Sequence, residues 1–163
     1  MRRDRSLIPL SHQHQHGLAL CVLIDRGLKK DPSRENVDKL SKMAADMAQI
    51  ELLSHFQVEE QVLFPAVRPL IENTALIDEL ISQHREMEQM IEELANQRGA
   101  ARKRTLLDFS DLLNRHIRSE ERQLFQEIQA NVGEFRLAQL GRQIEDRVHK
   151  LCPSTQYLPW ESQ

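Results

Sequence analysis

Residues 75–94 read ALIDELISQHREMEQMIEEL and carry the clearest structural signal in the chain. Apolar residues, with one histidine among them, recur there at alternating steps of three and four: Ile77, Leu80, His84, Met87, Ile91 and Leu94. This spacing puts the six residues on one face of an α-helix and is typical of helices that pack together in a bundle. We expect Asn73 and Thr74 to open this helix and Gly99 to end it.

Residues that break helices divide the rest of the chain into further periodic segments joined by short connections. We expect helices over about residues 11–29, 33–64, 101–131 and, as a shorter fifth piece, 134–150. Pro65 and Pro69 are expected to prevent a regular continuation of the second helix. The sequence therefore predicts an all-α fold, an up-and-down four-helix bundle over about residues 10–131, with a short additional C-terminal helix and a tail over about 134–163.

Composition limits the class of protein. A chain of 163 residues, 40% of them hydrophobic, can bury the core of one domain, so we expect residues 1–163 to form a single domain. The net charge of −3, with acids and bases interspersed, argues against nucleic acid as a partner. The longest apolar run, Leu18 to Ile24, is far too short to cross a membrane. Two cysteines make no disulfide framework and no export signal is evident, so we expect a cytoplasmic protein.

A repeated motif carries the chemistry. The second segment contains HFQVEEQVLF from His55 to Phe64, and the fourth contains HIRSEERQLF from His116 to Phe125, with His, Glu, Glu, Leu and Phe in identical register. A histidine and a glutamate four residues apart lie on one helix face, with Cβ atoms about 5–6 Å apart, so both reach a single metal cluster.

In both helices the face that carries this pair is the apolar one, which puts Glu59 and Glu120 at core positions. Burying an unpaired carboxylate is costly, and coordination to a cation is one of the few arrangements that offsets the cost. The other two helices each bring a histidine to the same kind of position, His14 in the first and His84 in the third. The predicted metal ligands are His14, His55, Glu59, His84, His116 and Glu120.

This ligand set suits two metal ions. Each ion would receive two imidazole nitrogens and oxygens from the bridging carboxylates, and a solvent-derived oxo or hydroxo bridge would complete the pair. Nitrogen and oxygen donors without thiolate favour two Fe ions, with Zn or Mn as substitutes. The Glu-x-x-His spacing of ferritin-type di-iron proteins and the His-Glu-x-x-His motif of zinc proteases are both absent.

These segments resemble the hemerythrin HHE cation-binding family over about residues 10–130. The matching pieces are Leu10-Ser11 with the histidine cluster that follows, residues 55–65, His84 and residues 116–125. The resemblance implies an up-and-down bundle, a non-haem di-iron centre with bridging carboxylates, and roles that range from O2 carriage to sensing, NO or peroxide handling and repair of damaged iron–sulfur centres.

One departure from the family narrows these roles. Oxygen-carrying hemerythrins have a second histidine four residues after the one in the third helix, and this chain has Glu88 there. The difference argues against simple reversible O2 carriage. Three roles are possible for Glu88: an extra metal ligand, an acceptor that orients a ligating histidine, or a solvated charge.

Several polar residues near the motif keep alternative roles. His12 and His16 flank His14 and are alternatives to it as the ligand of the first helix, since a shift in helix register would exchange them. Glu60 and Glu121 lie about 100° off the apolar face, which favours solvation or an ion pair, with metal ligation as an alternative for Glu121.

Three functions follow as hypotheses. The first is a di-iron protein that binds or senses a small diatomic or peroxide ligand, such as O2 or NO, at an open iron site. The second is an enzyme or iron-handling protein that turns over NO or peroxide or repairs iron–sulfur centres. The third is a helical interaction module with a vestigial metal site, against which the complete second copy of the motif argues.

Overall fold

The computed structural model describes residues 2–152, and every regular element in that range is helical. The expected C-terminal helix is present as α8, whereas the expected tail beyond it, residues 153–163 with Trp160, lies outside the described residues. Within this range no helix combines the length and the apolar character that crossing a bilayer requires.

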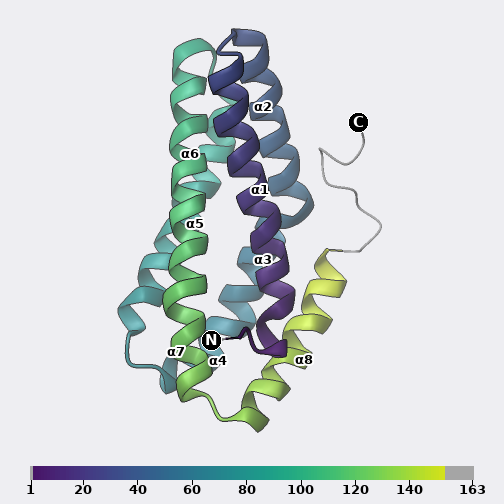
Figure 1. The fold of residues 1–163 in the computed structure, drawn as a ribbon, viewed down its shortest axis with the longest axis vertical. Helices are drawn as coiled ribbons and strands as arrows, with labels where there is room; N and C mark the ends of the chain where they lie inside the picture. Colours follow the sequence, from purple (N-terminus) through teal and green to yellow (C-terminus); the bar gives the residue numbers. More distant parts are fainter. Residues whose placement is uncertain (1, 153–163) are drawn as a thin grey trace.

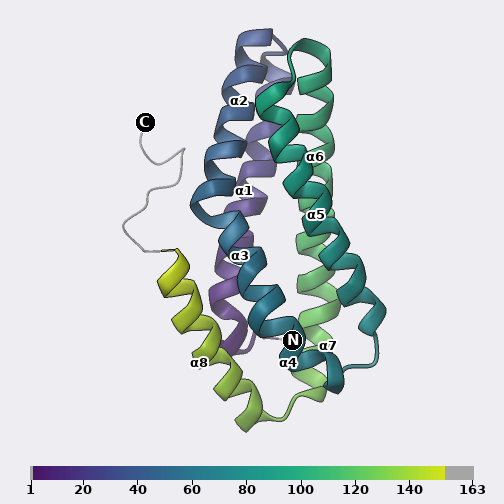
Figure 2. The same ribbon diagram turned by 180° about the vertical axis from the view of Figure 1, so that it is seen from behind.

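Four long helical segments lie side by side along the long axis of the molecule (Figures 1 and 2). The helix α1 packs against α2 and α6, and α5 packs against the same two helices from the other side. The α-helices of these segments are α1 Ile8–Lys30, α2 Arg34–Met47, α3 Leu53–Val58, α4 Phe64–Val67, α5 Thr74–Asn96, α6 Gly99–Ser119 and α7 Phe125–Asn131. The all-α prediction is therefore confirmed.

The second and fourth segments are unbroken helices that contain π-helical turns. These turns are Ala48–Leu52, Glu59–Leu63 and Glu120–Leu124. The second segment runs to Val67, a little beyond Phe64 as expected, and gives way at Pro69 to a 3-10 turn, Arg68–Leu70. A π turn precedes Pro65, because the Phe64 N–H bonds to the Glu59 carbonyl five residues back. This wider turn accommodates the proline, which has no N–H to donate to the helix.

The third segment begins where the sequence indicated. Asn73 is the N-cap of α5, and its side chain accepts a hydrogen bond from the Leu76 N–H at 3.3 Å. Its end differs from the expectation, because α5 stops at Asn96 and Gly99 instead begins α6. Gly99 has φ +58°, a backbone conformation that glycine adopts without strain, so it makes the tight connection between the two helices.

The amino-terminal turn and the last helix pack together at one end of the bundle. A 3-10 turn, Arg5–Leu7, precedes α1, and α8, Glu134–Leu151, packs against it (Figure 1). At the crossing, a Cβ added to Gly141 would lie 2.7 Å from the Cα of Ser6, so glycine is required for this close approach. The helix α8 thus covers the amino-terminal turn and also packs against α3 and the π turn Glu59–Leu63.

The hydrophobic core forms two clusters along the bundle. One cluster joins Leu20, Ala44, Phe56, Met87 and Phe109, and the other joins Leu10, Leu63, Leu80, Leu124 and Ile144, with further residues in each. On every long segment the predicted ligands fall between the residues of the two clusters. A layer of buried polar side chains therefore lies between two apolar regions that shield it from water.

The docking of α8 can be tested at Ile144, which is fully buried in the second cluster. Ile144→Ala should lower the free energy of unfolding by about 2–5 kcal/mol, because it leaves a cavity under the helix. Chemical denaturation measures the change. The matched control is the exposed Arg142 on the same helix, where alanine should cost less than about 0.5 kcal/mol. Equal effects at the two positions would mean that α8 is not packed as described.

Candidate metal centre

Six buried side chains converge in the polar layer between the two clusters. Each is at most 3% exposed, and together they are the predicted set: His14, His55, Glu59, His84, His116 and Glu120. They divide into two groups of four, and both groups contain both glutamates. Within each group the potential ligand atoms all lie within 4.8 Å of one another. This is the arrangement that two neighbouring cations would share.

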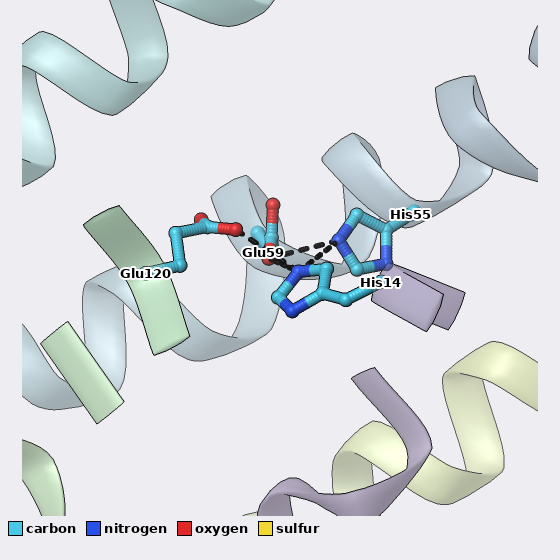
Figure 3. A group of neighbouring side chains, drawn as sticks. All are labelled: His14, His55, Glu59 and Glu120. Carbon is cyan, nitrogen blue, oxygen red and sulfur yellow. Dashed lines mark hydrogen bonds and ion pairs between the residues drawn. The ribbon is translucent and has the colours of Figure 1, made fainter. Parts of the chain in front are cut away.

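The first group joins α1, α3 and the two π turns (Figure 3). The Nε2 atoms of His14 and His55 are 3.0 Å apart. His14 Nε2 lies 3.0 Å from a carboxylate oxygen of Glu120, and His55 Nε2 lies 3.1 Å from one of Glu59. The two imidazole rings and the two carboxylates therefore point toward a common centre.

The second group repeats this geometry with α5 and α6. The Nε2 atoms of His84 and His116 are 3.2 Å apart. His84 Nε2 lies 3.2 Å from Glu59 Oε2, and His116 Nε2 lies 3.4 Å from Glu120 Oε2. Because Oε1 of Glu59 faces His55 and Oε2 faces His84, this carboxylate stands between the two groups in the position of a bridging ligand.

The outer nitrogen of every histidine meets an oxygen that can only accept. His14 Nδ1 lies 2.7 Å from Glu121 Oε1, and His84 Nδ1 lies 2.8 Å from Glu60 Oε1. The Nδ1 atoms of the remaining histidines meet the amide oxygens of two glutamines: His55 with Gln13 at 2.8 Å and His116 with Gln83 at 2.9 Å. Each Nδ1 must therefore carry the hydrogen and donate.

This assignment decides what faces inward. When Nδ1 carries the hydrogen of a neutral imidazole, Nε2 presents a lone pair. Four lone pairs and two carboxylates then converge in the buried layer, where no other protein group hydrogen-bonds to an oxygen of Glu59 or Glu120. Only protons or a cation can offset this concentration of negative charge. Hydrogen bonds to the outer nitrogen are also what orients histidines that bind metals.

The pKa values of three cluster residues are raised, and in each case neighbouring carboxylates contribute to the shift. Burial lowers the pKa of His14, but its contacts with Glu120, Glu121 and Glu59 outweigh burial and raise that pKa well above the ordinary value. Contacts with Glu59 likewise outweigh burial and raise the pKa of His84. Burial and the charge of Glu59 raise the pKa of Glu120. The cluster thus holds protons where a metal ion would bind.

The pKa values of two further groups in the cluster are lowered. Burial and the neighbouring charge of His84 lower the pKa of His116 well below its usual range. The pKa of Glu59 is also lowered well below its usual range, because the charge of His55 and contacts with three histidines outweigh the effect of burial. Both groups are therefore held in the deprotonated form that binds a metal.

Two of the three π turns, Glu59–Leu63 and Glu120–Leu124, carry the glutamates of the cluster. Glu59 and Glu120 each begin a π-helical turn, and each accepts through its carbonyl a bond from the N–H five residues on, at Phe64 and Phe125. A π turn contains one residue more than an α-helical turn. The equivalent residues Glu59 and Glu120 therefore depart from α-helical geometry in both copies of the motif. The sequence repeat is therefore also a repeat of local structure at the site.

The alternatives for the neighbouring polar residues are resolved by their contacts. His12 is exposed, and His16 contacts Glu51, with His16 Nδ1 2.9 Å from Glu51 Oε1, so His14 is the histidine that joins the cluster. Glu88 pairs with the half-exposed Arg85 and takes no part in either group.

Glu60 and Glu121 do more than was expected of them. Of the two roles expected for them, solvation or an ion pair, the structure shows ion pairs, Glu60 with Arg85 and Glu121 with Arg3. Their second role, accepting from a cluster histidine, was not predicted. Charges from His14 and Arg3, together with hydrogen bonds from His14 and Ser11, outweigh burial and lower the pKa of Glu121 to about 2.

The two glutamines behind the site were missed by the sequence analysis. Gln13 and Gln83 each precede a cluster histidine directly, although the pair Gln-His also occurs at Gln15-His16, outside the cluster. Gln83 is fixed in orientation, because its amide nitrogen donates to Glu79 at 2.9 Å while its oxygen faces His116. The repeated dipeptide was the signal that could have identified them.

Comparison with known proteins agrees with this geometry. A family model described as "Hemerythrin HHE cation binding domain" matches residues 9–128, which covers most of the chain. No match was found among the curated proteins or among the solved structures.

The raised pKa values of His14, His84 and Glu120 predict how metal affinity depends on pH. A group with a raised pKa keeps its proton to a higher pH, so a metal must displace protons that an ordinary histidine would already have lost. Affinity for a divalent metal should therefore fall as the pH falls, starting above the usual histidine range, and binding should release protons into a weakly buffered solution. A pH-independent affinity without proton release would contradict the described cluster.

Proposed function

We propose, starting from the fact that the chain belongs to the hemerythrin family of HHE cation-binding domains, that it is a non-haem di-iron protein of the up-and-down four-helix type. The six clustered side chains would be the ligands, with Glu59 and Glu120 bridging. It would bind or sense a small oxidant such as O2 or NO at an open iron position. The observation that carries the proposal is that two groups of potential ligands share both carboxylates.

The donor atoms favour iron. Four imidazole nitrogens and two carboxylates form a nitrogen and oxygen set without thiolate, which suits Fe or Mn and accepts Zn as a substitute. The nearby Cys21 is not available as a donor, since its Sγ bonds to the Ser110 carbonyl at 3.3 Å and burial raises its pKa to about 11. When bound, iron would supply electrons and a free coordination position for a small ligand.

A small cavity beside the cluster supports a small ligand. Its volume is about 10 Å³, which is roughly the room for a single water-sized molecule. Ligand histidines form one side of it, and apolar side chains form most of the rest; the lining includes His14, His55, His116, Leu52, Leu113 and Ile117. A ligand that enters this cavity must therefore be small.

The two halves of the site differ at the cavity. Three residues after the histidine of α1 stands Gly17, which lines the cavity, whereas three residues after the histidine of α5 stands Met87, which is fully buried in the core. The absence of a side chain at Gly17 therefore leaves room next to one half, and a methionine fills the corresponding place in the other. This asymmetry supports one ligand position per site.

One observation favours a second candidate, enzymatic turnover of NO or peroxide. Glu51 lines the same cavity, is 6% exposed, and contacts His16, whose side chain is 28% exposed. Reduction of peroxide consumes protons, so an acid between solvent and the cavity suits turnover. Addition of NO or peroxide to the reduced protein separates the candidates, since a lasting adduct indicates binding or sensing and rapid decay to product indicates an enzyme.

Removal of either shared carboxylate should reduce iron loading. Glu59→Ala and Glu120→Ala are each expected to lower the iron content after anaerobic ferrous reconstitution from about two ions per chain, since each removes a ligand from both groups. Metal analysis of the purified protein measures the change. Glu88→Ala is the matched control and should keep full loading. Full loading in both glutamate variants would refute the bridging assignment.

Filling the cavity should slow ligand entry without removing iron. A Cβ at Gly17 would lie 2.8 Å from Ile117 Cδ1, so Gly17→Ala should slow NO binding to the reduced protein by about tenfold or more. Stopped-flow absorption measures the rate. Adding Ile117→Val removes that carbon atom and should restore much of the rate. Met87→Leu, at the corresponding place in the other half, should have little effect, and equal slowing there would contradict the assignment of the cavity.

A further inference from the structure

We infer that Arg3, in the segment before α1, is a positioning residue of the metal centre that holds Glu121 behind His14 and so fixes one half of the ligand set. The inference rests on the proposed function, because it concerns how tightly this half of the cluster holds its metal. Arg3 is far from the motif in sequence and belongs to no helix.

The segment that carries Arg3 is fixed in place by several contacts. Arg3 Nη2 donates to the Glu121 carbonyl at 2.8 Å and pairs with the Glu121 carboxylate. Arg3 Nη1 donates to Gln129 Oε1 at 3.0 Å, and the Asp4 N–H donates to the same oxygen at 3.1 Å. Gln129 in turn donates to the Arg2 carbonyl at 3.0 Å. The segment is therefore tied to the last turns of the fourth helical segment.

Two contacts connect Arg3 to the ligand. Arg3 pairs with Glu121 Oε2, and the other carboxylate oxygen, Oε1, lies 2.7 Å from His14 Nδ1 and accepts from Ser11 at 2.6 Å. The guanidinium also lies 4.9 Å from the centroid of the Phe125 ring, which stacks on the His14 ring with centroids 5.5 Å apart. Arg3 thus fixes the His14 ring through a carboxylate at its edge and through an aromatic ring on its face.

The other half of the site also has an arginine behind the outer carboxylate of a histidine. Arg85 pairs with Glu60, which faces His84 Nδ1, and Phe64 stacks on the His84 ring with centroids 6.0 Å apart. Arg85 directly follows His84, whereas the residue that follows His14 is Gln15. The sequence repeat does not supply an arginine to the first half, and the amino-terminal segment brings one to the equivalent place.

The two arginines differ in their surroundings. The side chain of Arg3 is 19% exposed and pairs with Glu121, whereas that of Arg85 is 53% exposed and is shared between Glu60 and Glu88. An exposed ion pair contributes little, because water and salt screen it. Loss of Arg3 should therefore loosen its half of the site more than loss of Arg85 loosens the other half.

The contact between α8 and the amino-terminal turn extends the same connection. Gly141 lets α8 approach the Cα of Ser6, three residues after Arg3. A methyl group at Gly141 would push the turn away from the bundle, and with it the segment that carries Arg3. A substitution on α8 should therefore act on the metal site although it contacts no ligand.

The experiment follows the removal of iron from the reduced, fully loaded protein by a ferrous chelator. Wild type should release both ions slowly. Arg3→Ala should release one of the two ions about 10–100-fold faster and the other at the wild-type rate. Arg3→Lys, which keeps the charge but not the forked geometry, should fall between them. Gly141→Ala should accelerate the same single ion.

Arg85→Ala is the matched control. It should accelerate the other ion by a smaller factor, so that the variant lacking both arginines releases both ions quickly. Thermal unfolding of the iron-free variants monitors folding, and a general loss of stability would accelerate both ions equally. Equal acceleration of both ions by Arg3→Ala, or none, would overturn the inference. A wild-type protein that never binds two ions would refute the proposed function instead.

Discussion

Glu59 and Glu120 lie fully buried between four helical segments, and no hydrogen bond satisfies their oxygens. Two fully buried carboxylates this close repel each other, and only positive charge at their centre offsets the cost. The surrounding structure concentrates ligands for such a charge, since every outer histidine nitrogen is bonded so that the inner one presents its lone pair. The apolar clusters on both sides keep water from relieving the conflict. Burial of these carboxylates thus ties the folding of the bundle to the binding of a cation.

The site is built from two similar halves whose differences carry the specific chemistry. The motif, the π turns and the histidine partners repeat, which explains why two groups of potential ligands share one pair of carboxylates. The halves differ where a small ligand would enter, with Gly17 in one and Met87 in the other, and in the arginine behind each outer carboxylate, Arg3 or Arg85. A repeated scaffold can hold two metals, and local departures from the repeat make the two positions unequal.

Much of the fold and all six cluster residues could be predicted because both depend on local spacing. Steps of three and four residues reveal a buried helix face, and a polar residue on that face, such as His84, reveals a site. The rest depends on contacts between distant segments or on backbone register. No local pattern shows that Arg3 reaches Glu121, or that a π turn, Glu59–Leu63, precedes Pro65. Glu60 looked like a solvated charge because its partner, His84, lies on another helix.

The most direct test of the central claim is to locate the metal in crystals of the iron-loaded protein by anomalous diffraction at the iron absorption edge. The account predicts two anomalous peaks about 3.5–4 Å apart, one beside His14 and His55 and the other beside His84 and His116, with the carboxylates of Glu59 and Glu120 between them. A single peak, peaks at the protein surface, or an iron-free cluster in protein that retains the fold would contradict it.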